Sequence, residues 1–146
     1  MKAPDLFTDS DREKIRLAIE EAESMTSGEI RVYIEDECKT EVLDRAVFIF
    51  AELDMHLTDI RNGVLIYLAV IDKKFAIIGD AGIHSKVGDE FWKLNKLKMS
   101  EFFKQSKFTE GLVSGILEAG SALKAHFPHQ GGDKNELSDD IIFGAE

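Results

Sequence analysis

One segment of the sequence, residues 61–82, constrains the fold more than any other. It reads RNGVLIYLAVIDKKFAIIGDAG, with a near-continuous apolar run over residues 64–71. Such a run is typical of a strand that is covered on both faces, rather than of a strand with one side in water. A short polar link at residues 72–74 permits a tight return before residues 75–78 become apolar again. The segment therefore predicts a central strand that pairs with the next strand in an antiparallel hairpin.

The residues before this segment predict a helix, a strand and a second helix. Thr8 precedes acidic residues, an order typical of a helix start, and the apolar side chains of residues 15–22 then follow helical spacing. Residues 30–34 alternate between apolar and polar side chains, as a strand with one more polar face does. Residues 42–53 return to helical spacing. This strand, this helix and the central strand form a βαβ unit, so we expect its two strands to be parallel.

The C-terminal half predicts two longer helices, over residues 89–104 and 112–127. Gly111, Gly115 and Gly120 lie in or beside the second helix, where each costs about 1 kcal/mol relative to alanine. Close packing against a neighbouring element would explain that cost. The whole pattern predicts a single α/β domain, in which a small mixed sheet (the βαβ unit plus the hairpin) lies between about four helices.

Length and composition indicate one domain and no membrane span. The chain has 146 residues, of which 44% are hydrophobic, enough for one core. We expect the domain to occupy residues 1–130, followed by an acidic tail over residues 131–146 that is interrupted by the apolar residues 141–143. No apolar stretch approaches the roughly 20 residues that span a bilayer, and the N-terminus lacks the features of a signal peptide. We therefore expect a cytoplasmic protein without direct membrane insertion.

The charge of the chain argues against a nucleic acid as its partner. A net charge of −10 and a pI near 4.9 would repel phosphate backbones. The lysine-rich stretch over residues 86–107 is typical of the solvated side of a helix. The single cysteine, Cys38, has no partner for an internal disulfide or a zinc site, so we expect a small core residue there.

The expected topology divides the polar side chains between two edges of the sheet. At the edge where the parallel strands end, Glu35, Asp36 and Glu37 would meet the hairpin residues Asp72 and Lys73. Ligands of open α/β sheets favour this carboxyl edge, which supports a site there. A solvated strand end is the ordinary alternative for these charges, and the sequence leaves both interpretations open.

The opposite edge gathers a second polar cluster, in which the hairpin returns Asp80 to the neighbourhood of Glu29, Arg61, Asn62 and Asp89. Glycines on both sides of Asp80 allow close approach, and hard divalent cations prefer clustered oxygen donors. Asp80 and Asp89 are therefore candidate ligands of calcium or magnesium. Arg61, Asn62 and Glu29 are candidate binding residues. The alternative is structural, with Asp80 as a turn acid, Asp89 as the acid of a helix start, and Arg61 and Asn62 as a turn.

Several of these motifs together resemble the TPM-domain family. They are SGEIRVYI at residues 27–34, the strand pair of residues 61–82, the helix start at Asp89, and FTEGLVSGI at residues 108–116. The resemblance covers Leu6–Phe127 and implies one α/β domain with a central sheet between helices. It also implies a family described as phosphatases, with acid phosphatase activity and calcium binding in plant members.

The resemblance places Asp80 and Asp89 at or near the acidic surface of the family, with Asn62 beside them. Many relatives carry a glycine–aromatic–glycine–leucine turn followed by an acid, whereas residues 79–83 of this chain read GDAGI. Many relatives are also exported and anchored in a membrane. We expect this chain to be a soluble variant of the bacterial type.

Two functions are consistent with these features. The first is a non-catalytic interaction domain that assists the assembly or quality control of a membrane-associated partner, as the resemblance implies. The second is a divalent-cation-dependent phosphomonoester hydrolase, in which Asp80 and Asp89 hold the cation and Asn62 or Arg61 orients the phosphate. The cluster contains no nucleophile, general acid or phosphate cradle, so the interaction domain is the simpler hypothesis.

Overall fold

The computed structural model describes residues 2–128 and 141–144. It contains two 3-10 helices (η), four α-helices and four strands within those ranges. In chain order they are η1 (Ala3–Leu6), α1 (Asp9–Glu23), β1 (Glu29–Glu35), α2 (Val42–Glu52), η2 (Met55–Leu57), β2 (Gly63–Ala69), β3 (Lys74–Gly79), α3 (Ala81–Lys104), α4 (Phe108–His126) and β4 (Ile142–Phe143).

The four strands form one mixed sheet in the order β3-β2-β1-β4. β1 and β2 are parallel, and β2 and β3 form the antiparallel hairpin, so the predicted βαβ unit and hairpin are both confirmed. Every residue of β2 is buried, as its near-continuous apolar run predicts. β4, which comes from the predicted acidic tail, pairs with β1 in parallel.

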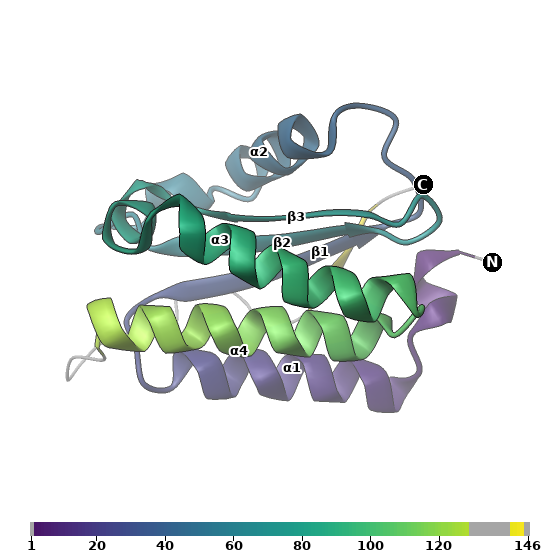
Figure 1. Ribbon diagram of the computed structural model, residues 1–146, viewed down its shortest axis with the longest axis horizontal. Coiled ribbons are helices and arrows are strands. Elements are labelled where there is room, and N and C mark those ends of the chain that lie inside the picture. Colours follow the sequence, from purple (N-terminus) through teal and green to yellow (C-terminus); the bar gives the residue numbers. More distant parts are fainter. Residues whose placement is uncertain (1, 129–140, 145–146) are drawn as a thin grey trace.

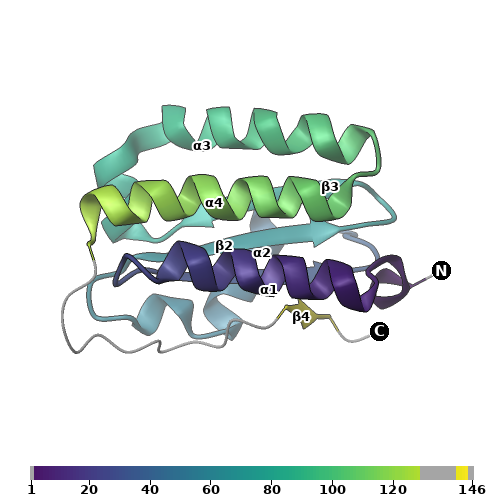
Figure 2. The same cartoon turned by 90° about the horizontal axis from the view of Figure 1, so that it is seen from below.

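Helices cover both faces of the sheet (Figure 1). α1, α4 and α3 lie side by side in one layer, with α4 in the middle, while α2 and the short η2 after it pack against the opposite face (Figure 2). The larger core fills the space between the sheet and the three-helix layer. A smaller core under α2 includes Cys38, which is 3% exposed and confirms the prediction of a small core residue.

The glycines of α4 allow its two neighbours to approach closely, as predicted. A Cβ atom added at Gly115 would lie 2.6 Å from Sδ of Met99 in α3, and one added at Gly120 would lie 2.6 Å from Cβ of Ala22 in α1. Gly111 packs against α3 in the same way. The helix layer therefore has no room for a side chain at these three positions.

The start of α3 differs from the prediction. The helix begins at Ala81 rather than at residue 89, with Asp80 as its N-cap, so the glycine-flanked turn is in fact a helix start. Gly88 interrupts the helix with a left-handed φ of 76°, and the more regular part follows it. The segment after residue 80 thus combines a short helical part with the helix that the apolar spacing predicts.

Only part of the predicted acidic tail lies within the described residues. Ile141–Gly144 lies against the domain, whereas residues 129–140 and 145–146, together with the boundary predicted at residue 130, fall outside the described ranges. None of the described helices is both long and apolar enough to cross a bilayer.

Candidate functional site

Asp80 is the centre of the second predicted cluster, and its carboxylate is fully engaged. Its Oδ1 accepts hydrogen bonds from the backbone N of Ala81 at 2.7 Å and from Nη2 of Arg61 at 2.7 Å. Its Oδ2 accepts from Nε of Arg61 at 2.6 Å. The Asp80 side chain is only 5% exposed, whereas that of Arg61 is 50% exposed. Asp80 therefore caps α3 and forms a bidentate ion pair with Arg61.

Arg61 is held in place by its backbone as well as by its side chain. Its φ is 53°, in the left-handed region that non-glycine residues rarely adopt. Its carbonyl accepts a hydrogen bond from the N of Gly82 at 2.8 Å, and a Cβ at Gly82 would lie 2.2 Å from the carbonyl oxygen of Ile60. Gly82 thus permits the close approach of the loop before β2.

Asn62 and Glu29 lie at the same edge of the sheet, as predicted, but neither is among the residues that line the hollow beside Asp80 described below. Asn62 is 1% exposed, and its Nδ2 donates to Oγ of Ser27 at 3.4 Å. Glu29 is 3% exposed and lies opposite Gly63 where β1 and β2 begin. Both side chains are part of the packing at the start of the parallel strands.

Asp89 is connected to this region through His84. The Asp89 side chain is 82% exposed, and its Oδ1 lies 3.5 Å from Nε2 of His84. Nδ1 of His84 accepts a hydrogen bond from Nε1 of Trp92 at 3.0 Å, which places the proton of the neutral imidazole on Nε2, facing Asp89. Within the described ranges no three His, Cys, Asp or Glu side chains are grouped so that they could hold a metal ion. The calcium or magnesium site stays a prediction.

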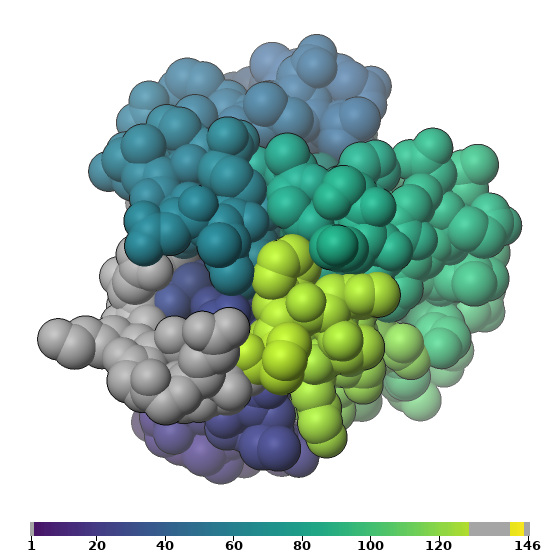
Figure 3. All heavy atoms as spheres, turned by 90° about the vertical axis from the view of Figure 1, so that its left-hand side faces the viewer, coloured from purple at the N-terminus to yellow at the C-terminus, as the bar shows by residue number. Residues whose placement is uncertain are grey.

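A hollow of about 500 Å³ opens beside the Asp80–Arg61 pair, between α2, β3 and the start of α3. Figure 3 faces this end of the molecule, where the loop before β2 (teal), the start of α3 (green) and the end of α4 (yellow-green) lie together. Apolar side chains of α2, two histidines and the ion pair are all among the residues that line it. The lining residues are Val47, Phe50, Ala51, His56, Arg61, Ile78, Gly79, Asp80 and His84.

The outer side of α2 and the loop after it are unusually apolar for a surface. Five large apolar side chains there are each at least half exposed, and we call them the α2 surface: Leu43, Val47, Phe48, Leu57 and Ile60. Val47 belongs both to this surface and to the wall of the hollow. The sequence indicates an apolar helix here, because residues 42–52 read VLDRAVFIFAE and are apolar on most sides of a helix. Only the fold shows which of those sides stays exposed.

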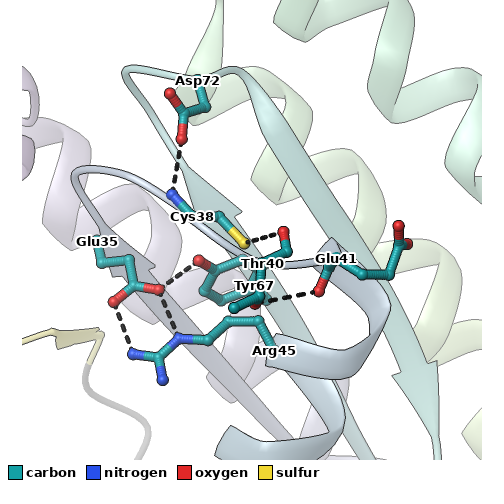
Figure 4. A network of polar contacts seen from close by, with 7 residues as sticks. All are labelled: Glu35, Cys38, Thr40, Glu41, Arg45, Tyr67 and Asp72. Atoms are coloured by element: carbon teal, nitrogen blue, oxygen red, sulfur yellow. Dashed lines mark hydrogen bonds and ion pairs between the residues drawn. The ribbon is translucent and has the colours of Figure 1, made fainter.

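The first predicted cluster, at the carboxyl edge, forms a network of structural contacts (Figure 4). Glu35 accepts two hydrogen bonds from Arg45, both at 2.9 Å, and a third from the hydroxyl of Tyr67. Burial acts to raise the pKa of Glu35, but the hydrogen bonds from Arg45 and Tyr67 outweigh it, so the pKa lies below its ordinary value. Asp72 accepts from the backbone N of Cys38 at 2.7 Å.

Among the residues that the structure describes, the other members of the first cluster are not grouped so that three of them could hold a metal ion. Asp36 accepts from the backbone N of Ala3 at 2.5 Å and thereby ties the N-terminus to the sheet. Glu37 is exposed, and Lys73 occupies a left-handed position in the hairpin turn with a φ of 53°. Carboxylates at this edge accept hydrogen bonds that connect neighbouring elements of the fold. These contacts favour a structural role for the first cluster over a ligand site.

Comparison with known proteins supports the fold and a family. The model of the TPM domain matches residues 2–122. The NMR structure of BA42 protein from the psychrophilic bacterium Bizionia argentinensis is 45% identical, with a TM-score of 0.88, and the match covers 94% of this chain and 95% of that one. No curated protein matches the sequence.

Two more distant solved structures share the fold. The N-terminal domain of the cg2496 protein from Corynebacterium glutamicum is 14% identical with a TM-score of 0.65, and the match covers 80% of this chain and 74% of that one. The N-terminal domain of a protein from P. gingivalis is 16% identical with a TM-score of 0.68, over 86% and 83% of the two chains.

Proposed function

Because the chain belongs to the TPM-domain family, and because its α2 surface is apolar and open, we propose that it is a non-catalytic interaction domain. The observation that carries this proposal is the group of half-exposed apolar side chains on α2 and the loop after it. Exposed apolar patches of soluble proteins commonly mark sites of association with other proteins. The role we assign is to hold an apolar segment of a partner during its assembly or quality control.

The charge around the α2 surface indicates the chemistry of that segment. Residues 41–60 contain five acidic side chains and one arginine, and the arginine, Arg45, is bound to Glu35. An apolar segment with lysine or arginine at its ends would complement this rim. Membrane proteins carry such basic flanks at the cytoplasmic ends of their apolar segments. We therefore propose a membrane-associated partner, met in the cytoplasm.

The hydrogen bonds within the second polar cluster also favour the interaction domain over the hydrolase. Arg61 and Asp80 satisfy each other, and Asp80 also caps α3. To bind a phosphate or a cation, the two side chains would first have to separate. An interaction domain needs no such rearrangement.

A binding assay with a matched control tests the proposal. The probe is a fluorescent synthetic peptide with a leucine–alanine core and lysine flanks, and its partner probe carries glutamate flanks. The double substitution Val47→Ser and Phe48→Ser should weaken binding of the lysine-flanked peptide about tenfold, because it removes apolar contact area. Leu94→Ser with Leu97→Ser removes equally exposed apolar side chains on α3 and should change the affinity by less than about twofold.

The two peptides separate charge from apolarity. The glutamate-flanked peptide should bind more weakly at low salt, and the difference should shrink as salt is added. Equal losses in both double variants, or no binding of either peptide, would contradict the proposal.

A second candidate function is a divalent-cation-dependent phosphomonoester hydrolase. One observation favours it, namely that Asp80, Arg61, His56 and His84 line a single hollow. Here Asp80 and Asp89 would hold calcium or magnesium, and Arg61 or Asn62 would orient the phosphate. Turnover of a generic phosphomonoester should then depend on the added cation and fall in Asp80→Asn. Turnover that is independent of the cation and unchanged in that variant would exclude this candidate.

A further inference from the structure

The edge of β1 already holds a short extended peptide, which is the chain's own segment Ile141–Gly144. β4 pairs in parallel with β1, with Ile142 opposite Tyr33 and Phe143 opposite Ile34. The N of Gly144 continues the ladder by donating to the carbonyl of Ile34 at 2.8 Å. The contact is that of a peptide added to a sheet edge, in which the backbone supplies hydrogen bonds and alternate side chains supply selectivity.

The side chain of Phe143 packs against Phe7 and Arg12 from the N-terminal part of the chain. Its ring lies 6.2 Å from the ring of Phe7, and the guanidinium of Arg12 lies 4.7 Å from its centroid. Arg12 is itself fixed, because its Nε donates to the carbonyl of Phe7 at 3.2 Å and its Nη2 to the carbonyl of Pro4 at 2.6 Å. A guanidinium held in this way can stack on an aromatic ring without first losing much conformational freedom.

The position after the aromatic residue selects glycine. A Cβ added at Gly144 would lie 2.8 Å from the hydroxyl of Tyr33 and 2.9 Å from Cβ of Glu35. Glu35 cannot easily move away, because Arg45 and Tyr67 hold its carboxylate (Figure 4). The network at the carboxyl edge of the sheet thus also shapes one end of this peptide site.

The segment fills its site only in part. Residues 141–144 are all partly exposed, and a hollow of about 480 Å³ remains beside Phe143. The ladder between β1 and β4 has two residue pairs within the described segment. A contact this short gains much of its occupancy from being in the same chain, and a free peptide of the same kind can compete with it. The hollow is lined by Asp9, Arg12, Glu13, Arg16, Ile141 and Phe143.

We propose that this edge is a binding site for an extended segment of a partner protein, with two aliphatic residues followed by phenylalanine and glycine. The segment runs parallel to β1, its phenylalanine lies between Phe7 and Arg12, and it replaces the chain's own residues 141–144. The occupant we assign is a partner's segment of the same kind as residues 141–144, because those residues show which side chains the edge accepts. This site lies on β1 and α1 and does not depend on the α2 surface.

The test uses a fluorescent peptide with the sequence of residues 138–146, SDDIIFGAE, and the full-length chain. In the variant Ile142→Ser with Phe143→Ser the internal segment no longer competes. If that segment occupies the edge for about nine-tenths of the time in the wild type, the variant should bind the peptide about tenfold more tightly. Equal or weaker binding by the variant, with its fold intact by circular dichroism, would overturn the proposal.

Two matched pairs show where the peptide binds. Arg12→Ala, introduced into the tail variant, should weaken binding about fivefold through loss of the ring contact. Lys14→Ala removes an exposed basic side chain of α1 that is not among the residues lining the hollow, and it should change the affinity by less than about twofold. A peptide with valine at the position of Gly144 should not bind. Equal effects of the Arg12 and Lys14 variants, or unchanged binding of the valine peptide, would contradict the site.

Two further measurements keep the outcome decisive. If the tail variant fails to fold, backbone amide shifts of Tyr33–Glu35 in the wild type are followed instead while unlabelled peptide is added, and shifts confined to other strands would overturn the proposal. Sedimentation of the wild type at rising concentration tests the other occupant. A dimer that disappears in the tail variant would show that a second copy, rather than a partner, fills the edge.

Discussion

Replacing Asp80 separates its structural role from any catalytic one. The side chain caps α3 through the N of Ala81, and loss of such a cap typically costs about 1 kcal/mol. Asp80→Ala also abolishes the pair with Arg61, which adds a salt-sensitive part. Asp80→Asn keeps a side-chain oxygen for the cap but loses the charge. We therefore expect Asp80→Ala to lower the free energy of unfolding by about 1 kcal/mol or more, and Asp80→Asn to lower it by less.

Urea denaturation of the wild type and the two variants measures this difference at low and at high salt. In a chain of this size a change of 1 kcal/mol corresponds to a fall in melting temperature of about 3 to 4 °C. The cap portion should persist at high salt, whereas the portion due to Arg61 should shrink. If Asp80→Ala is as stable as the wild type, the cap and ion pair do not explain why this carboxylate is buried, and a functional reason for its position becomes necessary.

Three further predictions concern the packing of the fold. The pKa of Glu35 is depressed, so its contribution to stability is present above its ordinary value of 4.5 and is lost as the pH falls through the lowered pKa. Arg45→Met should therefore reduce stability at pH 7 and reduce the further loss in acid, measured by denaturation at each pH. Gly120→Ala should destabilise the protein by about 1 to 3 kcal/mol despite its better helix propensity, since the new Cβ meets Ala22, whereas Ser121→Ala on the exposed side should be neutral or slightly stabilising. Cys38 should react with a thiol reagent only as the protein opens, so its rate in the native state should be far below its rate in denaturant.

The sheet could be predicted because its signals are local. The apolar run of residues 64–71 and the short polar link after it determine both the central strand and the hairpin, and alternation over residues 30–34 identifies the neighbouring strand. The glycines of α4 also predicted close packing correctly, because the cost of glycine in a helix needs a compensating contact.

The start of α3 could not be predicted from the same kind of signal. Asp80 between two glycines has the composition of a turn, and only the loop before β2, which approaches Gly82 from elsewhere in the sequence, shows why a glycine occupies the first turn of the helix. The left-handed Gly88 further hides the helix from a periodicity argument.

The sequence predicted which residues lie near one another in the candidate site, but it did not predict their contacts. Topology brought Arg61 and Asp80 to one edge of the sheet, as expected, but their mutual hydrogen bonds depend on a left-handed backbone at Arg61 that its sequence does not signal. The openness of the α2 surface has a similar origin. A helix that is apolar on most of its sides indicates extensive burial. Among the described elements, three α-helices cover one face of the sheet and a single α-helix covers the other, and this arrangement leaves α2 partly uncovered.

The most direct test of the interaction proposal is to map where the lysine-flanked apolar peptide binds, using backbone amide chemical shifts of the labelled protein. We expect the largest shifts in α2 and in residues 53–62, around the apolar side chains that those segments expose. Shifts concentrated on the lysine-rich face of α3, or scattered without a focus on α2, would contradict it.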